Sequence, residues 1–419
     1  MSAEVVIAGG GIMGASLALH LAQRGVAPVV LLEREPQLGT QTTHAGAGFV
    51  GYWAGELEAE LARYGIEFYE RLQAEGGVDL GVRHVGLLFP GLSEAGVEML
   101  RQEEERERPF ADVALVDADE TCRLAPLLSR DAVYGGLFQP EGRQVPTRRV
   151  INALAQRLTT AGVDVRTNTE ALGVQTTNGH VSGVDTTAGP IPAGTFVNAA
   201  GARARSLASR NHIEVASVPL LESRVVTEPL SEVTAHHPML LFFERDLFYV
   251  RTEDGGLLFG AIAQRLGPEE RVALTDPARS ADLPEHEAES HERLARDLAA
   301  VIPALQHAKV KERASGLPTW TPDGRHILGP APSIEGYYVL AGCNESGVTH
   351  GPGLARLAAE LIDTGRTDAD ISAYRVDRFG PLTDAALQAA AESQYLARHP
   401  PEAGQAPEPF GITIHRSSR

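Results

Sequence analysis

The sequence predicts an α/β fold in which a nucleotide-binding unit is interleaved with a domain built mainly on an antiparallel β-sheet. Near the N-terminus an apolar run leads into a glycine-rich turn and then into an Ala/Leu-rich segment. The same order of strand, glycine-rich loop and helix returns around residues 337–364. Between these ends, Asn178-Gly179 and Asp254-Gly255 each separate two short strand-like segments, which is a strong signal for a β-hairpin.

The N-terminal turn, residues 9–14 (GGGIMG), has the G-x-G-x-x-G spacing of a dinucleotide-binding motif and stands between a predicted strand and a predicted helix. Gly9 permits the tight turn, Gly11 lets the backbone approach a pyrophosphate, and Gly14 lets the helix pack closely on the strand. The N–H groups at the start of the helix favour phosphate. Glu33 follows a second apolar run and can accept hydrogen bonds from a ribose diol. The motif predicts a bound adenine dinucleotide and leaves open whether it is FAD or NAD.

The charge balance of the chain is strongly acidic. Its 419 residues carry a formal net charge of −18, which argues against a nucleic acid or an anionic membrane surface as the partner. Residues 93–108 are predicted to form a charged helix, and the run Glu103-Glu104-Glu105 is interpreted as its solvated face. Neither observation identifies a substrate.

No segment is predicted to cross a membrane. Residues 5–23 carry no formal charge and are long enough for a span, but three consecutive glycines and His20 argue against one. No basic segment precedes them, as a signal peptide would require. Cys122 and Cys343 are the only cysteines and lie far apart in the sequence, so we expect no disulfide framework. These observations predict a cytoplasmic protein.

Three further segments are candidates to contact the dinucleotide. A loop rich in threonine and glycine follows the second predicted strand and contains Thr42, Thr43 and His44. A later apolar run ends in a turn at Gly201, whose backbone can lie against the dinucleotide. The glycine-rich loop at residues 342–351 precedes a helix, which predicts a second backbone-lined site at a helix N-terminus.

Taken in this order, the motifs resemble the FAD-dependent amine oxidoreductases of the D-amino-acid oxidase superfamily. The resemblance covers residues 3–380 and is carried by the glycine motif with Glu33, by Asn198-Ala-Ala-Gly201, by Thr321-Pro-Asp-Gly and by Gly342-Cys-Asn-Glu-Ser-Gly347. It implies FAD as the cofactor, and a Rossmann-like FAD-binding domain interleaved with a mainly antiparallel β-sheet substrate domain.

The expected domain boundaries follow these motifs. We expect a discontinuous FAD-binding domain of residues 1–80, 145–215 and 321–380, and a substrate domain of residues 81–144 and 216–320. Residues 381–419 are expected to form a C-terminal helix and an irregular tail.

Two details resemble the sarcosine and dimethylglycine dehydrogenase branch of the superfamily. Thr42-Thr43-His44-Ala-Gly is similar to the stretch whose histidine carries FAD covalently through its 8α carbon, so the resemblance implies His44 as the point of attachment. Asn344-Glu-Ser-Gly-Val348 is similar to the flavin loop of that branch. Related enzymes often have Gly-x-Arg-Pro, with an arginine that holds the substrate carboxylate, where this chain has Gly316-Leu317-Pro318. Residues 222–227 also lack the histidine that the dimethylglycine branch has before its Val-Thr pair.

The motifs and the resemblance together assign a set of cofactor-binding residues from several parts of the chain. They are Gly9, Gly11, Ile12, Met13, Gly14, Glu33, Arg34, Thr42, Thr43, His44, Ala171, Ala200, Gly201, Gly342, Asn344, Glu345, Ser346, Gly347, Val348 and Thr349. No metal-binding residues are expected.

The implied reaction removes a hydride from a C–H bond next to an amine nitrogen and passes it to flavin N5. Tyr249 and Arg251 are the candidate residues on the substrate side, because alternation places both on one face of a predicted strand. The phenol can orient the amine and the guanidinium can bind a carboxylate through two hydrogen bonds; a surface pair across two strands is the alternative. His350 is the third candidate catalytic residue, either near the flavin O2 or as a helix cap.

The sequence therefore predicts an FAD-dependent oxidase or dehydrogenase that acts on a secondary or tertiary amine. The expected substrate is an N-alkyl amino acid such as sarcosine or dimethylglycine, and the expected electron acceptor is O2 or an electron-transfer acceptor. Two alternatives remain open: a flavin-dependent 2-hydroxy acid dehydrogenase, and a flavin-binding subunit of a larger amine dehydrogenase assembly. The oligomeric state is not predicted.

Overall fold

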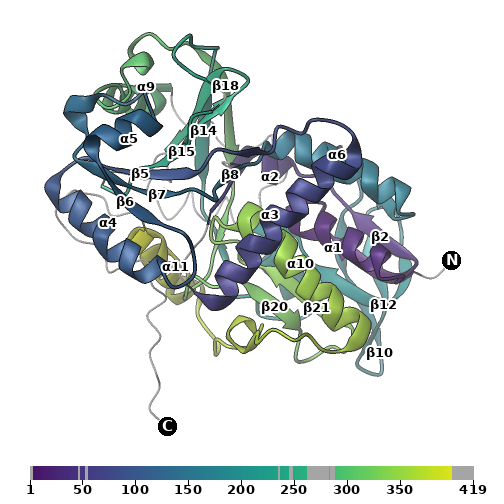
Figure 1. Ribbon diagram of the computed structural model, residues 1–419. Coiled ribbons are helices and arrows are strands. Elements are labelled where there is room, and N and C mark those ends of the chain that lie inside the picture. Colours follow the sequence, from purple (N-terminus) through teal and green to yellow (C-terminus); the bar gives the residue numbers. More distant parts are fainter. Residues whose placement is uncertain are drawn as a thin grey trace.

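Two eight-stranded sheets organise the chain, and each mixes segments that are far apart in the sequence (Figure 1). A computed structural model describes residues 3–45, 48–51, 55–234, 236–244, 249–261, 283 and 288–398. Among the helices in these ranges, none is both long enough and apolar enough to span a membrane.

The first sheet is the nucleotide-type sheet predicted from the glycine motif. Its central strands are parallel: β1 pairs with β2 on one side and β12 on the other, β2 pairs with β9, and β12 pairs with β21. Parallel strands place their carboxyl ends at one edge, where ligands bind in open α/β sheets. The strands of this sheet are β1 (Ala3–Ala8), β2 (Val29–Leu32), β9 (Asp164–Arg166), β10 (Ala171–Thr177), β11 (His180–Thr186), β12 (Ile191–Asn198), β20 (Ile327–Pro330) and β21 (Tyr337–Ala341).

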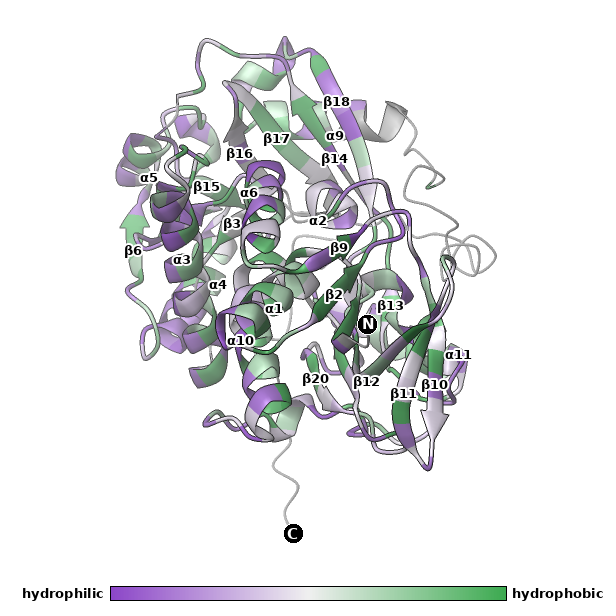
Figure 2. Cartoon of the chain, turned by 90° about the vertical axis from the view of Figure 1, so that its right-hand side faces the viewer, coloured by the Kyte–Doolittle hydropathy of each residue, from purple (hydrophilic) through white to green (hydrophobic). Residues whose placement is uncertain are grey.

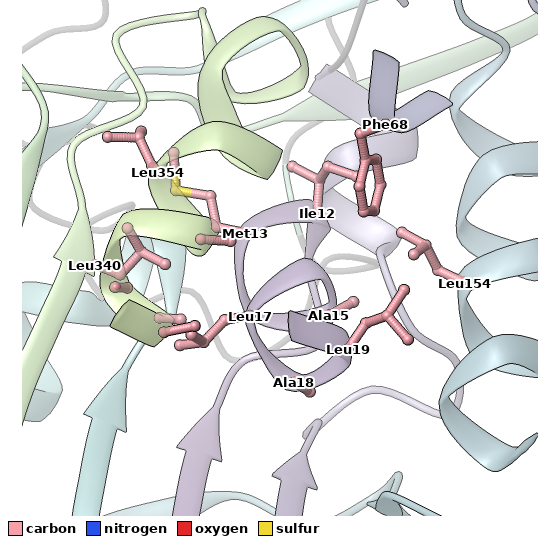
Figure 3. Packing of buried hydrophobic residues seen from close by; sticks show 14 of the residues in the cluster. Ile12, Met13, Ala15, Leu17, Ala18, Leu19, Phe68, Leu154, Leu340 and Leu354 are labelled. Atoms are coloured by element: carbon pink, nitrogen blue, oxygen red, sulfur yellow. The ribbon is translucent and has the colours of Figure 1, made fainter. Parts of the chain in front are cut away.

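Helices cover this sheet because its strands are apolar on both faces. All four residues of β2 are buried, and Figure 2 shows β2 and β12 as mainly hydrophobic. α1 (Ile12–Gln23) is buried from Ile12 to Leu21 and packs against α10 (Gly347–Thr364) and α6 (Thr147–Thr160). In Figure 3, Leu340 and Leu354 lie on one side of α1, and Phe68 of α3 (Glu56–Gly76) lies on the other.

A buried hydroxyl compensates for a proline near the start of α10. Pro352 has no N–H group, so the carbonyl of Val348 has no helical donor four residues later. The hydroxyl of Tyr69, on α3, donates to this carbonyl at 2.7 Å. Burial raises the pKa of Tyr69, so its proton stays in place for this contact. The first turn of α10 is thereby anchored to α3.

The second sheet is mainly antiparallel, as predicted. Its strand order is β18-β14-β17-β16-β15-β5-β7-β6, and the pair β15–β5 is the parallel exception among the described pairs. The strands are β5 (Leu87–Gly91), β6 (Ala114–Asp117), β7 (Gly135–Gln139), β14 (Glu222–Thr227), β15 (Met239–Leu241), β16 (Tyr249–Glu253), β17 (Gly256–Ala261) and β18 (Val310–Gly316).

Both hairpin predictions are confirmed. Asn178 and Gly179 connect β10 to β11 with φ values of 54° and 81°. Asp254 and Gly255 connect β16 to β17 with φ values of 49° and 90°. Positive φ at both central residues matches the right-handed twist of the flanking strands, and Asn-Gly and Asp-Gly adopt it at low cost.

The interpretation of the run Glu103-Glu104-Glu105 as a solvated face is wrong for its first two residues. α4 (Glu94–Glu107) packs on β5, β6 and β7, and Glu103 and Glu104 are only 5% and 8% exposed. Arg106 pairs with Glu103, and Arg108 pairs with Glu104 at 2.7 Å. These arginines offset the cost of burying the carboxylates, which a charge count along the sequence does not reveal.

The remaining elements are short strands and peripheral helices. β3 (Phe49–Val50), β8 (Arg143–Gln144) and β4 (Arg83–His84) form one small sheet, and β13 (Val218–Pro219) pairs with β19 (Thr319–Trp320). α2 (Thr40–Ala45) contacts β14 and β18 of the second sheet. It also contacts α6, one of the helices that cover the first sheet. Among the described residues, the further α-helices are α5 (Ala118–Leu124), α7 (Ala204–Ser209), α9 (Ala288–Ala299) and α11 (Asp384–Arg398). The predicted irregular tail lies outside the described residues from residue 399 onward.

Candidate functional site

A cavity of about 220 Å³ opens where the parallel strands of the first sheet end. Its wall combines the turns after β1, β2 and β12, part of α2, the start of β14, and the loop before α10. Fourteen of the predicted cofactor-binding residues line it: Gly9, Gly11, Ile12, Met13, Glu33, Arg34, Thr42, Ala171, Ala200, Gly201, Gly342, Glu345, Gly347 and Val348. The fold therefore gathers segments from both ends of the chain at one cavity.

The three motif glycines have different structural requirements. A Cβ atom at Gly9 would lie 2.3 Å from the carbonyl oxygen of Ala199, and one at Gly14 would lie 1.9 Å from that of Gly9. Packing within the protein excludes a side chain at both. A Cβ at Gly11 would meet only the Thr42 hydroxyl, at 3.4 Å, among the described atoms. Gly11 lines the cavity, so its bare backbone fits a group that approaches from the cavity side.

The start of α1 faces the same cavity. Gly11 is the N-cap residue of α1, and it provides no side-chain cap. The N–H of Ile12 donates to the Thr42 hydroxyl at 3.0 Å, which connects α2 to this turn. The helix N-terminus carries a partial positive charge that favours phosphate. The bare glycine and the helix N-terminus together fit a pyrophosphate.

Glu33 occupies a fixed position at the end of β2. Its carboxylate accepts hydrogen bonds from the N–H groups of Gly10 and Glu35, each at 2.9 Å. Burial raises the pKa of Glu33, while these two hydrogen bonds act in the opposite direction. Nearby, Arg203 pairs with Glu170 at 2.9 Å, and both line the cavity. The part of the cavity next to the end of β2 therefore has the carboxylate that is expected to contact a ribose.

The loop before α10 forms the other end of the cavity. Asn344 and Glu345 have positive φ values of 43° and 62°, which turn the chain sharply. The side chain of Asn344 is buried: its Oδ1 accepts from the N–H of Thr321 at 3.0 Å, and its Nδ2 donates to the carbonyl of Gly342 at 2.9 Å. Asn344 thus fixes the loop through these hydrogen bonds and does not itself line the cavity. The predicted residues Gly14, Thr43, Ser346 and Thr349 also do not line the cavity.

His350 lies next to a second histidine, His326, which no sequence motif indicates as a site residue. The Nδ1 of His326 lies 2.9 Å from the carbonyl oxygen of Gly342, and its Nε2 lies 3.0 Å from the Nδ1 of His350. A carbonyl only accepts, so His326 donates through Nδ1; in its neutral form it then accepts from the Nδ1–H of His350 through Nε2. His350 does not line the cavity, and its catalytic role remains a prediction. The only sequence signal for His326 is its place directly after Thr321-Pro-Asp-Gly-Arg.

The predicted substrate-side residues lie on β16. Arg251 is 4% exposed, and its guanidinium carbon and Nη1 lie 3.0 Å from where a Cβ at Gly48 would stand. Gly48 lines the cavity, so the guanidinium lies next to this part of the cavity wall. The backbone of Tyr249 belongs to β16, but its side chain lies outside the described part of the structure.

Glu222 is a cavity residue that the sequence analysis did not assign. It opens β14, lines the cavity and is 7% exposed. Burial, and then the neighbouring Glu345, raise the pKa of Glu222 well above its usual value. A single acidic residue after the apolar run Val218-Pro-Leu-Leu221 was the only signal in the sequence. Among the described residues, no group of three or more His, Cys, Asp or Glu side chains could hold a metal ion.

His44 lies on α2, next to β18 of the second sheet. Its ring hydrogen-bonds to the backbone of Ser315 on β18, and burial followed by the nearby Arg224 lowers its pKa. Thr40, Gln41 and Thr42 of the same helix line the cavity, whereas His44 does not.

If the cofactor is FAD, as the sequence resemblance implies, we expect it to be released when the protein is precipitated with acid, which leaves a yellow supernatant. The absorbance spectra of pellet and supernatant measure this. Colour that stays in the wild-type pellet but not in that of a His44→Ala variant would contradict the placement of His44 and establish it as the attachment point.

Comparison with protein families matches residues 4–361 to DAO, the FAD dependent oxidoreductase family. The mitochondrial pyruvate dehydrogenase phosphatase regulatory subunit of Mus musculus is 28% identical over 387 residues, which are 91% of this chain and 43% of that protein. Mitochondrial dimethylglycine dehydrogenase of Homo sapiens is 27% identical over 394 residues, 91% of this chain and 45% of that protein. The chain thus spans less than half the length of these relatives.

A solved structure with the same fold is that of L-proline dehydrogenase from P. horikoshii. The two structures superpose with a TM-score of 0.79 at 23% sequence identity, over 90% of this chain and 98% of the other. The similarity confirms the predicted α/β architecture.

Proposed function

The chain belongs to the DAO family of FAD-dependent oxidoreductases, and we propose that it oxidises a secondary or tertiary amine of the N-alkyl amino acid class, such as sarcosine or dimethylglycine. The family has FAD as its cofactor. The amine class is supported by human dimethylglycine dehydrogenase, which is 27% identical and whose name gives its substrate.

Different segments of the cavity wall have the chemistry to bind different parts of FAD. The bare backbone at Gly11 and the start of α1 would hold the pyrophosphate, and the Glu33 carboxylate would bind the ribose. The loop at residues 342–347, held by Asn344, would contact the flavin ring. When bound, FAD supplies the acceptor for the hydride that leaves the amine.

The substrate would enter between this loop and the second sheet. Arg251 would bind the substrate carboxylate, because a guanidinium presents two parallel N–H donors to a carboxylate. The amine must be neutral to give up hydride, so a nearby group has to take its proton. Tyr249 is proposed to orient the amine nitrogen. We propose O2 or an electron-transfer acceptor as the final oxidant.

The observation that carries this proposal is the joining of the glycine turn and the loop before α10 at one cavity. A second candidate function is a flavin-binding subunit without catalysis of its own. It is supported by the 28% identical pyruvate dehydrogenase phosphatase regulatory subunit, whose name describes a regulatory protein.

Anaerobic titration of the FAD-loaded protein separates these functions. We expect sarcosine or dimethylglycine to bleach the visible flavin band and 2-hydroxy acids to leave it unchanged. Bleaching by hydroxy acids alone would replace the amine by an alcohol substrate. If dithionite bleaches the flavin band and none of the small substrates bleaches it, the result would support the subunit function instead.

A further inference from the structure

Two carboxyl groups from different parts of the fold meet inside the cavity. Glu222 comes from the start of β14, and Glu345 comes from the positive-φ loop before α10. Both line the cavity, and their side chains are hydrogen-bonded to each other. The register of β14 with β18 places Gly316 opposite Glu222, so the neighbouring strand supplies no charged side chain at this position.

A hydrogen bond between two carboxyl groups requires a proton, because an ionised carboxylate can only accept. Two such groups in a buried site cannot both ionise at low cost, so the pair holds one proton and one negative charge. Cys343, on the same loop as Glu345, is the other group whose charge raises the pKa of Glu222. No cationic side chain from the described residues is among the groups that shift the pKa of Glu222.

One oxygen of the pair is left for a ligand. The Oε1 atom of Glu222 is buried and has no hydrogen-bond partner among the described residues. A buried acceptor without a partner is costly, and a donor supplied by a ligand removes that cost. Leu317 and Pro318 line the cavity as well and give an apolar surface for alkyl groups.

We propose that Glu222 and Glu345 act as one monoanionic carboxyl pair that binds the ammonium group of the substrate and accepts its proton. The identity of the substrate rests on the proposed function. In this step the N–H bond of the ammonium breaks, its proton forms an O–H bond on the ionised carboxyl, and the electron pair stays on nitrogen. The neutral amine can then lose a hydride from its C–H bond and become an iminium cation.

Two probes that differ by one charge test cation binding without turnover. Glycine betaine carries a quaternary ammonium, and 3,3-dimethylbutanoate has carbon in place of that nitrogen and the same carboxylate. Isothermal titration calorimetry on the FAD-loaded protein measures both affinities. We expect the Glu222→Gln/Glu345→Gln double variant to bind betaine at least tenfold more weakly and 3,3-dimethylbutanoate equally well. If the double variant binds both probes more weakly by the same factor, or binds betaine as tightly as the wild type, the proposal is overturned.

Single variants test whether one charge is shared. In Glu222→Gln, the remaining Glu345 can ionise and accept a hydrogen bond from the new amide, so most of the betaine affinity should remain. A loss as large as in the double variant would overturn the shared charge. Glu98→Gln, at an exposed position on α4, is the matched control and should bind both probes like the wild type. Glu345→Gln gives the same comparison if Glu222→Gln does not fold.

The pH profile of flavin reduction tests proton acceptance. In the wild type the pair takes the proton of the bound ammonium, so the rate should reach its plateau well below the pKa of the free amine. In the double variant the rate should keep rising with pH towards that pKa. Identical profiles would overturn this part. If no amine reduces the wild-type flavin, the proposed function fails, whereas the calorimetric comparison still decides whether the pair binds a cation.

Discussion

Gly11→Ala is expected to weaken FAD binding by on the order of 100-fold, about 2.7 kcal/mol, while the apoprotein stays folded. A Cβ at this position meets only the Thr42 hydroxyl, at 3.4 Å, so the protein itself accommodates the methyl group. The methyl group would occupy the space through which a pyrophosphate reaches the start of α1. Quenching of FAD fluorescence during titration measures the affinity, and thermal unfolding of the apoprotein measures the fold.

Gly14→Ala is the matched comparison within the same motif. Its Cβ would lie 1.9 Å from the carbonyl oxygen of Gly9, so the turn or the helix must move. We expect this variant to lose roughly 3 kcal/mol of stability, at the upper end of the usual cost of overpacking. If Gly11→Ala unfolds as readily as Gly14→Ala, or keeps its full FAD affinity, then Gly11 serves packing and not the cofactor.

Arg251→Leu is expected to lower kcat/KM for N-methyl amino acids by roughly 100-fold, the scale of one charge-assisted bidentate contact in a buried site. The guanidinium is buried next to Gly48 of the cavity wall. An amine without a carboxylate, such as dimethylamine, should react with the variant and the wild type at similar rates. Steady-state kinetics with both substrates measures the difference.

Two further variants sharpen this comparison. Arg251→Lys keeps the charge but not the planar pair of donors, so it should recover only part of the lost activity. Arg101→Leu removes an exposed arginine of α4 and should behave like the wild type. If Arg251→Leu slows both substrates equally, Arg251 acts by supporting the wall at Gly48 and does not bind the carboxylate.

Local sequence patterns predicted the parts of the fold that local chemistry controls. Asn178-Gly179 and Asp254-Gly255 predicted two hairpins because positive φ at both positions is a property of the residues themselves. The glycine motif likewise predicted a turn between β1 and α1. It did not separate the roles of Gly11 and Gly14, because their difference depends on which atoms lie beside each Cβ.

Pairings between distant segments could not be predicted in this way. Glu222 and Glu345 meet only because β14 and the loop before α10 reach the same cavity, and no local pattern joins them. His326 and His350 meet for a similar reason, because the residue before β20 and the first turn of α10 both reach the loop at Gly342. The burial of Glu103 could not be predicted either, because the packing of α4 on the second sheet is a tertiary feature.

We propose that the chain oxidises the C–H bond next to an amine nitrogen in this cavity. Anaerobic stopped-flow mixing of the FAD-loaded protein with dimethylglycine that carries ordinary or fully deuterated methyl groups tests it most directly. We predict that both compounds bleach the visible flavin band, and that the deuterated one does so several-fold more slowly because its C–D bond breaks in that step. No bleaching by either compound, or a band reduced by 2-hydroxy acids instead, would contradict the claim.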